Sequence, residues 1–468
     1  MRNSTIMSNT AVSHGGGIWH QNSGTMTIEG SEFGYNRGAN GGAYVSNDSV
    51  QTLITDSVFS HNYAGGNGGA VWIINNDDGL TQIVNSTFTS NQADGRGGGI
   101  YNDVRSTMFV TDTIVQRNQA GTSGGGIHTD KILTLHDTQI VSNSVTIGDG
   151  GGLALGNSSA VVTQTGVITL AYNQAGNQGG GVYVGDGRLT LDGARILSNQ
   201  ANTGGAFYQN DFTDAITVTN SCIVFNSDTA VFYENGGPAM TVTGNWWGAK
   251  DGPSGAASGH GDSVNTLSSI DVSGFLTTAP VGCPTYTPVL TLGGGDNQIT
   301  QVDQAFTSPL SITLSTVEQP RPIIGAVITF TGPSSGAGIT PAIVTATTDV
   351  DGIAEVTTTA NGDWGDYEVT AVAEYPTAPI TFALQNYTFY ALTTATGGVG
   401  SGTVTAGAVY TSSTVVTITC DCEYRFELRR LGGGCGRRHQ STDRDHGRRQ
   451  IHNRHLRPES VHPDRGQG

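Results

Sequence analysis

The chain has 468 residues, of which 69 are glycine and 14 are proline, and only 13% of its residues carry a charge. Glycine is about twice its usual frequency of about 7%, without the G-X-Y period of collagen. No stretch approaches the run of about 20 apolar residues that a membrane-spanning helix needs, so we predict no membrane-spanning segment. With threonine, valine and asparagine abundant, this composition favours short strands joined by tight turns and excludes a mainly helical architecture.

Charge is distributed unevenly along the sequence. Residues 1–419 hold ten basic and 31 acidic residues, whereas residues 420–468 hold eleven Arg and seven acidic residues. An acidic body disfavours nucleic acid and anionic membrane surfaces as partners. We therefore predict no nucleic-acid partner for the main part of the chain.

Two motifs recur in phase over the first 230 residues. In the first, an apolar residue is followed by two variable residues and then Asn, and successive Asn residues lie 25 to 30 positions apart. The second consists of two or three Gly followed by Ala or an apolar residue, as in 97–100. A repeat of this length over more than 200 residues indicates a solenoid. The Asn residues of the first motif are Asn9, Asn36, Asn62, Asn91, Asn118, Asn143, Asn173, Asn199 and Asn226.

The segments between the motifs alternate polar and apolar residues, as in 82–88, which is the periodicity of a β-strand. One repeat has room for three short strands and three turns, which is one coil of a parallel β-helix. Each coil must stack on its neighbours, about 4.8 Å away, to bury its inward face. We therefore predict an all-β chain with about nine parallel coils over residues 1–235.

The two motifs are assigned to the corners of each coil. Asparagine tolerates the left-handed backbone conformation, and its side chain can hydrogen-bond the equivalent Asn of the next coil. The Gly pairs permit a positive φ and a close approach between two backbones. The Asn residues of the repeat are therefore predicted to have a structural role.

Both motifs resemble the repeats of the chlamydial polymorphic membrane proteins and of similar bacterial surface proteins, over about residues 1–230. The resemblance implies a right-handed parallel β-helix of the pectin-lyase-like type. It also implies a protein that is secreted or displayed on a cell surface and is often adhesive.

The repeats give way after residue 235 to the sequence Asn245-Trp246-Trp247-Gly248. Residues 236–285 resemble the terminal segment of many bacterial β-helix proteins, which folds over the last coil. Trp246 and Trp247 are suited to cover the apolar end of the solenoid, and the alternative is an aromatic platform on which sugars stack. Cys222 and Cys283 are candidates for a disulfide in an exported protein, and the sequence leaves their pairing open.

Residues 286–386 have a different pattern. Strand-like segments such as 323–330 and 365–370 are separated by turns. Their order resembles the bacterial Ig-like modules of invasin and intimin, which are antiparallel sandwiches. We predict an Ig-like domain here.

The C-terminal residues fall into two parts. Residues 387–419 resemble the first half of a small β-module similar to the listerial internalin B repeat, and residues 420–468 lose the alternating pattern. When codons permitted for 420–467 are read one base later, one allowed translation supplies the missing half of the module. We therefore interpret 420–468 as a disordered, frameshifted tail in preference to a basic binding arm or a zinc site.

The β-helix fold also occurs in pectate lyases and polygalacturonases, which makes catalysis an alternative function. Resemblance to those hydrolases requires paired Asp, Gly-His-Gly and Arg-Ile-Lys segments in order. The corresponding pieces here, Asp77-Asp78, Gly259-His260-Gly261 and Arg195, are out of order and far apart in the repeat. Two carboxylates must lie within about 5–10 Å of one glycosidic bond. We predict no catalytic, cofactor-binding or metal-ligating residues and no cofactor.

The sequence is thus interpreted as a secreted or cell-surface structural or adhesive protein. Its β-helix is expected to bind an extracellular glycan or a surface protein of a host or neighbouring cell. The alternative is a polysaccharide lyase or glycoside hydrolase that acts on acidic polysaccharide, since a fold does not dictate function. Because Met1 falls inside a coil, we expect an export signal and an N-terminal cap to lie upstream.

Overall fold

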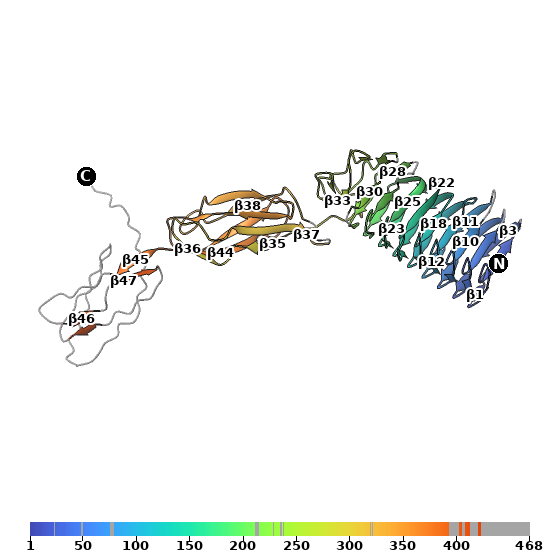
Figure 1. Ribbon diagram of the computed structural model, residues 1–468, viewed down its shortest axis with the longest axis horizontal. Coiled ribbons are helices and arrows are strands. Elements are labelled where there is room, and N and C mark those ends of the chain that lie inside the picture. Colours follow the sequence, from blue (N-terminus) through green and yellow to red (C-terminus); the bar gives the residue numbers. More distant parts are fainter. Residues whose placement is uncertain are drawn as a thin grey trace. The chain divides into compact units, whose positions relative to one another are not determined.

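The computed structural model describes residues 1–392, apart from 23, 48, 49, 75–78, 211–214, 228, 235, 237, 319 and 321, together with 402–404, 408–411 and 420–422. Over these residues every regular element is a β-strand and no helix occurs, which confirms the all-β prediction. Accordingly, no helix that could cross a membrane is found in this part of the chain. The chain divides into two compact units, Met1–Thr287 and Pro288–Gly468 (Figure 1).

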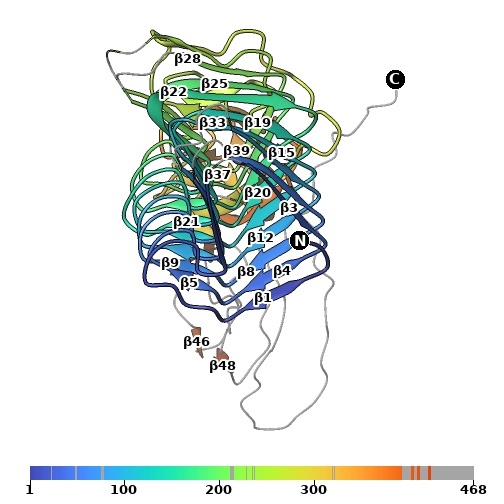
Figure 2. The same cartoon turned by 90° about the vertical axis from the view of Figure 1, so that its right-hand side faces the viewer.

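The first unit is a parallel β-solenoid of about nine coils, as predicted. Figure 2 shows the coils stacked on one another, with β1, β4, β8 and β12 along one side and β5, β9 and β21 along another. Each strand pairs in parallel with the equivalent strand of the next coil, so the register is set by the repeat. Within the described residues, the strands form three sheets.

The first sheet has nine strands, in the order β1 (Thr5–Met7), β4 (Glu32–Gly34), β8 (Val58–Ser60), β12 (Thr87–Thr89), β16 (Ile114–Gln116), β20 (Gln139–Val141), β23 (Thr169–Ala171), β26 (Arg195–Leu197) and β29 (Cys222–Val224). The six-stranded sheet follows the Asn corner and consists of β5 (Arg37–Gly38), β9 (Tyr63–Ala64), β13 (Gln92–Ala93), β17 (Gln119–Ala120), β21 (Ser144–Val145) and β24 (Gln174–Ala175).

The nineteen-stranded sheet receives two strands from most coils, and these merge into single long strands in β22 and β25. Its strands are β2 (Ile18–Gln21), β3 (Gly24–Glu29), β6 (Tyr44–Asn47), β7 (Val50–Thr55), β10 (Val71–Ile74), β11 (Leu80–Val84), β14 (Ile100–Asn102), β15 (Thr107–Thr111), β18 (Ile127–Thr129), β19 (Ile132–His136), β22 (Leu153–Thr165), β25 (Val182–Asp192), β27 (Phe207–Gln209), β28 (Ala215–Thr219), β30 (Val231–Tyr233), β31 (Met240–Thr241), β32 (Pro253–Gly255), β33 (Gly261–Val264) and β34 (Ile270–Asp271).

The core of the solenoid is built from equivalent apolar residues that stack coil upon coil. Phe33, Phe59 and Phe88 are in register on the first sheet and fully buried. Their ring centroids are 4.7 and 4.8 Å apart, and both pairs are tilted by only 5°. Burying one such side chain stabilises the fold by roughly 1.5–3 kcal/mol, so the Phe positions of the repeat form a continuous apolar ladder.

The left-handed residue at the Asn corner is not the Asn. Instead the residue immediately before each Asn has a φ between 53° and 65°, for example Ser90 before Asn91 and Arg117 before Asn118. The expectation that Asn itself adopts this conformation was therefore wrong. The left-handed residue turns the chain, and the following Asn side chain is then directed into the coil interior, where it is buried.

The Gly motif makes another corner, with separate roles for its first two residues. The first Gly has a positive φ in every coil from Gly15 to Gly204, between 56° and 69°. The second is needed for space, because a Cβ on Gly98 would lie 2.3 Å from the carbonyl oxygen of Gly125. The positive φ and the close approach of two backbones, both predicted for the Gly pairs, are therefore confirmed.

The second unit contains two sheets that share one apolar core. β35 (Pro288–Gly294), β37 (Leu310–Thr316) and β41 (Ile353–Val356) form an antiparallel sheet. A mixed sheet has the order β36 (Gln298–Gln301), β44 (Ile380–Tyr387), β43 (Gly365–Ala373), β38 (Val327–Thr331) and β40 (Ile343–Thr347), with β36 parallel to β44. Leu290 and Ile312 from the first sheet and Phe330 and Phe382 from the second belong to the same buried cluster.

Three further strand pairs complete the second unit. These are β39 (Ile339–Thr340) with β42 (Thr359–Ala360), β45 (Phe389–Leu392) with β47 (Ala408–Thr411), and β46 (Gly402–Val404) with β48 (Cys420–Cys422). Strand β48 lies beyond the predicted boundary at residue 419. The remainder of the predicted disordered tail, 423–468, is outside the described residues.

The close approach at the Gly corner predicts a large cost for a single methyl group. We expect Gly98→Ala to lower the free energy of unfolding of the solenoid by roughly 1–3 kcal/mol, because the new Cβ overlaps a backbone oxygen that cannot move independently. Gly65→Ala is the control, since its Cβ would meet only one atom, at 3.7 Å. Urea unfolding curves of the two variants measure the difference, and equal midpoints would contradict the steric role of Gly98.

Candidate functional site

The predicted Asn residues form one continuous ladder inside the solenoid. From Asn9 to Asn199, the backbone N–H and the side-chain Nδ2 both donate to Oδ1 of the Asn in the next coil, at 2.9 to 3.1 Å. From Asn36 onward, Nδ2 also donates to the carbonyl of the apolar motif residue in the preceding coil. Asn36 to Asn226 are at most 1% exposed. The ladder therefore satisfies the buried polar groups of each Asn corner.

The ladder ends on a buried carboxylate that the sequence interpretation missed. Asn226 donates from its N–H and its Nδ2 to Oδ2 of Asp262, at 3.0 and 2.8 Å. The other oxygen, Oδ1, accepts from the N–H of Phe225 and from the hydroxyl of Tyr286. Oδ2 of Asp262 thus takes the place that Oδ1 of the next Asn has in the other rungs. Asp262 follows the repeats as a single residue, so no periodic signal marks it.

A second ladder of hydroxyl groups was also missed. The N–H groups of Ser31 and Ser57 donate to Oγ of the equivalent Ser57 and Ser86 in the next coil, at 3.1 and 3.2 Å. Ser86 continues the ladder to Thr113 at 3.4 Å. These residues stand two positions before the apolar motif residue, so extending the FxxN pattern by two residues would have found them.

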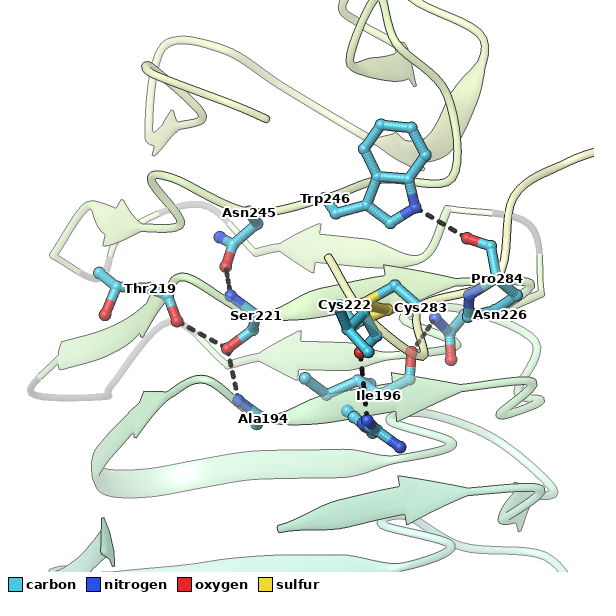
Figure 3. Close-up of a disulfide and its surroundings, with 12 residues drawn as sticks. Ala194, Ile196, Thr219, Ser221, Cys222, Asn226, Asn245, Trp246, Cys283 and Pro284 are labelled. Atoms are coloured by element: carbon cyan, nitrogen blue, oxygen red, sulfur yellow. Dashed lines mark hydrogen bonds between the residues drawn. A yellow bond between two sulfur atoms is a disulfide. The ribbon is translucent and has the colours of Figure 1, made fainter. Parts of the chain in front are cut away.

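Both predicted cap residues are buried, and Figure 3 shows Trp246 with the carbonyl of Pro284. Trp246 and Trp247 are 2% and 0% exposed, and Trp246 Nε1 donates to the carbonyl of Pro284 at 2.7 Å. Neither indole therefore offers a face to a sugar. A disulfide joins Cys222 of the last coil to Cys283, with 5.9 Å between the Cα atoms. It links the solenoid covalently to the segment that follows its cap.

The pieces that resemble hydrolase segments make separate contacts. Asp77-Asp78 lies outside the described residues. His260 hydrogen-bonds Asp251 through Nδ1. Burial alone would raise the pKa of Asp251, but the bonds and charge of His260 outweigh burial and lower it. Arg195 donates to the carbonyl of Val281 at 3.3 Å. No group of three or more metal-ligating side chains occurs among the described residues.

The face of the nineteen-stranded sheet that points away from the core carries a row of equivalent residues, one from each coil. In each coil the apolar residue that ends the Gly motif, such as Ile100, packs in the core. Because side chains alternate along a strand, the next residue points to the opposite face of the sheet. These outward residues are in register from coil to coil and are mostly aromatic. A residue pattern of Gly-Gly-x-apolar-aromatic was the available signal. This row, which we call the aromatic row, consists of Trp19, Val45, Trp72, Tyr101, His128, Ala154, Tyr183, Tyr208 and Phe232.

The C-terminal end of the aromatic row opens into a pocket of about 590 Å³. The rings of Tyr208 and Phe232 are parallel, with centroids 5.2 Å apart, so each covers one face of the other. In the next coil Phe232 is followed by Asn265, which lines the pocket. Tyr208 donates to Glu234 at 2.6 Å, and burial together with this carboxylate raises the pKa of Tyr208. We call this cavity the Phe232 pocket; it is lined by Gln178, Thr203, Tyr208, Phe232, Tyr233, Glu234, Asn265 and Thr266.

Polar side chains meet at His128, in the middle of the aromatic row. Ser123 Oγ lies 2.8 Å from His128 Nδ1, and His128 Nε2 lies 3.1 Å from Asp130 Oδ1. The other oxygen of Asp130 accepts from the Tyr101 hydroxyl at 2.6 Å and lies 3.6 Å from Arg96 Nη1. The side chains of His128 and Asp130 are 3% and 4% exposed, whereas that of Arg96 is 49% exposed. We call this group the His128 cluster.

The electrostatics of the His128 cluster fix the direction of its hydrogen bonds. Burial lowers the pKa of His128, so the imidazole is neutral at pH 7. Burial alone would raise the pKa of Asp130, but the hydrogen bonds from His128 and Tyr101 and the charge of Arg96 outweigh it, so the carboxyl group is ionised. Because a carboxylate only accepts, His128 Nε2 carries the proton and Nδ1 accepts from the Ser123 hydroxyl.

Comparison with known families supports the repeat. The Chlamydia polymorphic membrane protein repeat matches residues 56–73 and 85–103. Each matched segment contains one Asn corner and the Gly corner that follows it. The chain is thus similar to that repeat at two successive coils. Among curated proteins, no match to the chain was found.

The Asn ladder predicts a specific loss of stability. We expect Asn118→Leu to reduce the free energy of unfolding by roughly 1–3 kcal/mol for each buried group that it leaves without a partner, because Asn91 loses its acceptor and Asn143 its donors. Asn202→Leu serves as the control, because Asn202 is exposed. If thermal and urea unfolding give equal stability for the two variants, the ladder does not hold the corner.

The buried imidazole predicts acid destabilisation. The folded-state pKa of His128 is lowered from 6.5, so below that pH the unfolded chain binds one more proton and stability falls as the pH falls, by up to about 1.4 kcal/mol per pH unit. His128→Gln should flatten this slope below pH 6.5. His61→Gln, at an exposed histidine, controls for loss of a histidine. Free energies of unfolding measured across this pH range test the prediction. An unchanged slope in His128→Gln would refute the buried neutral state of His128.

Proposed function

We propose that the chain is a surface-exposed adhesive protein whose solenoid binds an extracellular glycan in the Phe232 pocket. The similarity to the Chlamydia polymorphic membrane protein repeat supports placement at a cell surface. The disulfide between Cys222 and Cys283 fits an oxidising compartment outside the cytosol. Both observations agree with export of the chain.

The chemistry of the Phe232 pocket is the observation that carries glycan binding. Sugars present apolar C–H faces and polar hydroxyl edges, and binding sites of mixed character combine an aromatic surface with a few placed polar groups. Phe232 supplies the aromatic surface beside Tyr208, while the amide of Gln178 and the carboxylate of Glu234 supply hydrogen-bonding groups. The pocket therefore offers both kinds of contact within one cavity.

The charge of the pocket favours neutral or amino sugars over acidic ones. Glu234 is the acidic group that lines the pocket, and no basic residue is among the described residues that line it. A carboxylate repels the uronic acids of acidic polysaccharides and attracts a protonated amino group. This argument separates the proposal from the alternative of an enzyme that acts on acidic polysaccharide.

The remaining parts of the chain are assigned supporting roles. We take residues 1–235 as a right-handed, pectin-lyase-like solenoid and 236–285 as its cap. Residues 286–386 are assigned as an Ig-like module, because its two sheets share one core, and 387–419 as a partial β-module. Modules of this kind act as spacers in bacterial surface proteins, which suits an adhesive stalk.

Removal of the aromatic surface tests glycan binding. The wild-type protein is first screened against neutral, amino and acidic oligosaccharides, and the best ligand is then titrated calorimetrically. We expect Phe232→Ala to weaken binding about tenfold, since an aromatic contact contributes about 0.5–1.5 kcal/mol beyond its buried area. Tyr35→Ala is the control, because Tyr35 is an exposed aromatic residue at the Asn corner, away from this pocket.

Two outcomes would refute the proposal. One is that the wild-type protein binds no oligosaccharide in the screen. The other is that Phe232→Ala and Tyr35→Ala bind the selected ligand as tightly as the wild type does. A preference for acidic oligosaccharides would overturn the assignment of neutral or amino sugars as the ligand class.

A further inference from the structure

We propose that Ser123, His128 and Asp130 form a site that hydrolyses small acyl esters, such as acetyl esters of sugar hydroxyl groups. The site is separate from the Phe232 pocket, which lies four coils further along the aromatic row. The inference does not depend on glycan binding. Nucleophile, base and orienting carboxylate are recognised by their mutual geometry and not by their order in the sequence.

The His128 cluster departs from the repeat, which argues that the fold alone does not require it. In the neighbouring coils, the positions equivalent to Ser123 are Arg96 and Asp149, and those equivalent to His128 are Tyr101 and Ala154. No other described coil of the aromatic row has a histidine at this position. A buried carboxylate and imidazole are also costly unless they are paired. Their presence in one coil is a local exception to an otherwise apolar or aromatic row.

The geometry of the three side chains suits nucleophilic catalysis. Ser123 is half-buried, whereas His128 and Asp130 are buried. Ser123 Oγ is within hydrogen-bond distance of Nδ1, which carries the lone pair, and Asp130 holds the opposite nitrogen. In the familiar serine hydrolase triad the two nitrogens have the reverse roles. The base and its orienting group are nevertheless on opposite sides of the ring, as the chemistry needs.

The proposed reaction consumes an ester and water and gives an alcohol and a carboxylic acid. Ser123 Oγ attacks the carbonyl carbon while His128 Nδ1 takes its proton, and the C–O bond to the alcohol then breaks as Nδ1 returns that proton to the leaving oxygen. The product is an acyl ester on Ser123. Water attacks this ester, His128 again takes and returns a proton, and the carboxylic acid is released with Ser123 restored.

Arg96 is the group placed to stabilise the negative charge on the carbonyl oxygen. The backbone N–H groups of Gly124 and Gly125 already donate to carbonyls of the next coil, at 3.1 and 3.0 Å, so they do not form an oxyanion hole. The backbones of Arg96 and Ser123 pair in a parallel bridge, and the half-exposed guanidinium of Arg96 lies 3.6 Å from Asp130 within the His128 cluster. On the other side, Asp149 Oδ1 is engaged by Asn177 and Gln178. With one half-exposed side-chain cation in place of fixed backbone amides, we expect slow turnover.

Covalent labelling tests the nucleophile directly on the full chain. The wild-type protein is treated with a fluorophosphonate, and the adduct is located by mass spectrometry of peptides. We expect one adduct on Ser123, and its absence would overturn the proposal. Because this measurement uses the wild-type protein, it does not depend on whether a variant folds. It also uses no glycan, so its failure is distinguishable from failure of glycan binding.

Turnover of p-nitrophenyl acetate tests the catalytic assignment. We expect Ser123→Ala and His128→Gln each to lower the rate at least tenfold, whereas Ser144→Ala, at a serine that is likewise half-buried, leaves it unchanged. Circular dichroism and thermal unfolding confirm that each variant is folded. Equal rates for wild type and a folded Ser123→Ala would refute the proposal.

The pH profile gives an independent signature of His128. The groups that face this imidazole are Asp130, Tyr101, Asp103 and Arg96. Since burial outweighs their combined effect and lowers the pKa of His128, the rate should fall with acid through a midpoint below pH 6.5, as Nδ1 becomes protonated. A rate that rises only with hydroxide concentration would show that Ser123 is not activated by His128.

Discussion

Each coil of the solenoid depends on the coil that follows it for the acceptor of its corner amide. Asn118 cannot satisfy its N–H and Nδ2 within its own coil; both donate to Asn143, and the same holds at every rung. An unpaired buried amide costs roughly 1–3 kcal/mol, so the ladder makes stacking obligatory. Because each rung donates its N–H and Nδ2 to the Oδ1 of the next coil, the last rung needs an acceptor beyond the repeat. Asp262 meets this need, and Tyr286 and the nearby disulfide hold the same end of the rod.

These constraints act on the inside of the coil and leave one outward position per coil free to vary. The second Gly of each corner and the stacked core residues are fixed by contact with the next coil, as Gly98 and Phe88 illustrate. The aromatic row varies more in residue type, with Trp72, Tyr101, His128 and Ala154 at equivalent positions of successive coils. Binding and catalytic chemistry can therefore change from coil to coil while the rod stays the same. The two proposed sites accordingly lie at different coils of a single row.

Residues that recur in every coil could be recognised from the sequence, whereas functional or structural residues that occur only once could not. The Asn and Gly motifs are visible because every coil needs them, and they were sufficient to predict a parallel solenoid of about nine coils. The left-handed residue was misplaced because residues as different as Ser90, Arg117 and Tyr172 occupy it. Asp262 has no period. The Ser123 hydroxyl meets His128 only because the Gly corner between them, with left-handed Gly124, folds the chain back on itself.

The solenoid also explains how one coil can carry a costly cluster. In a stack of this kind, stability is close to a sum of coil and interface contributions, so burying Asp130 and His128 weakens one interface without removing its neighbours. The coil that carries His128 is bordered by the amide ladder through Asn118 and Asn143 on the Asn corner, whose hydrogen bonds do not involve the cluster. Cooperative stacking of the neighbouring coils thus supports a buried, pH-sensitive pair, and acid should loosen the rod first at this interface, where the imidazole gains its proton.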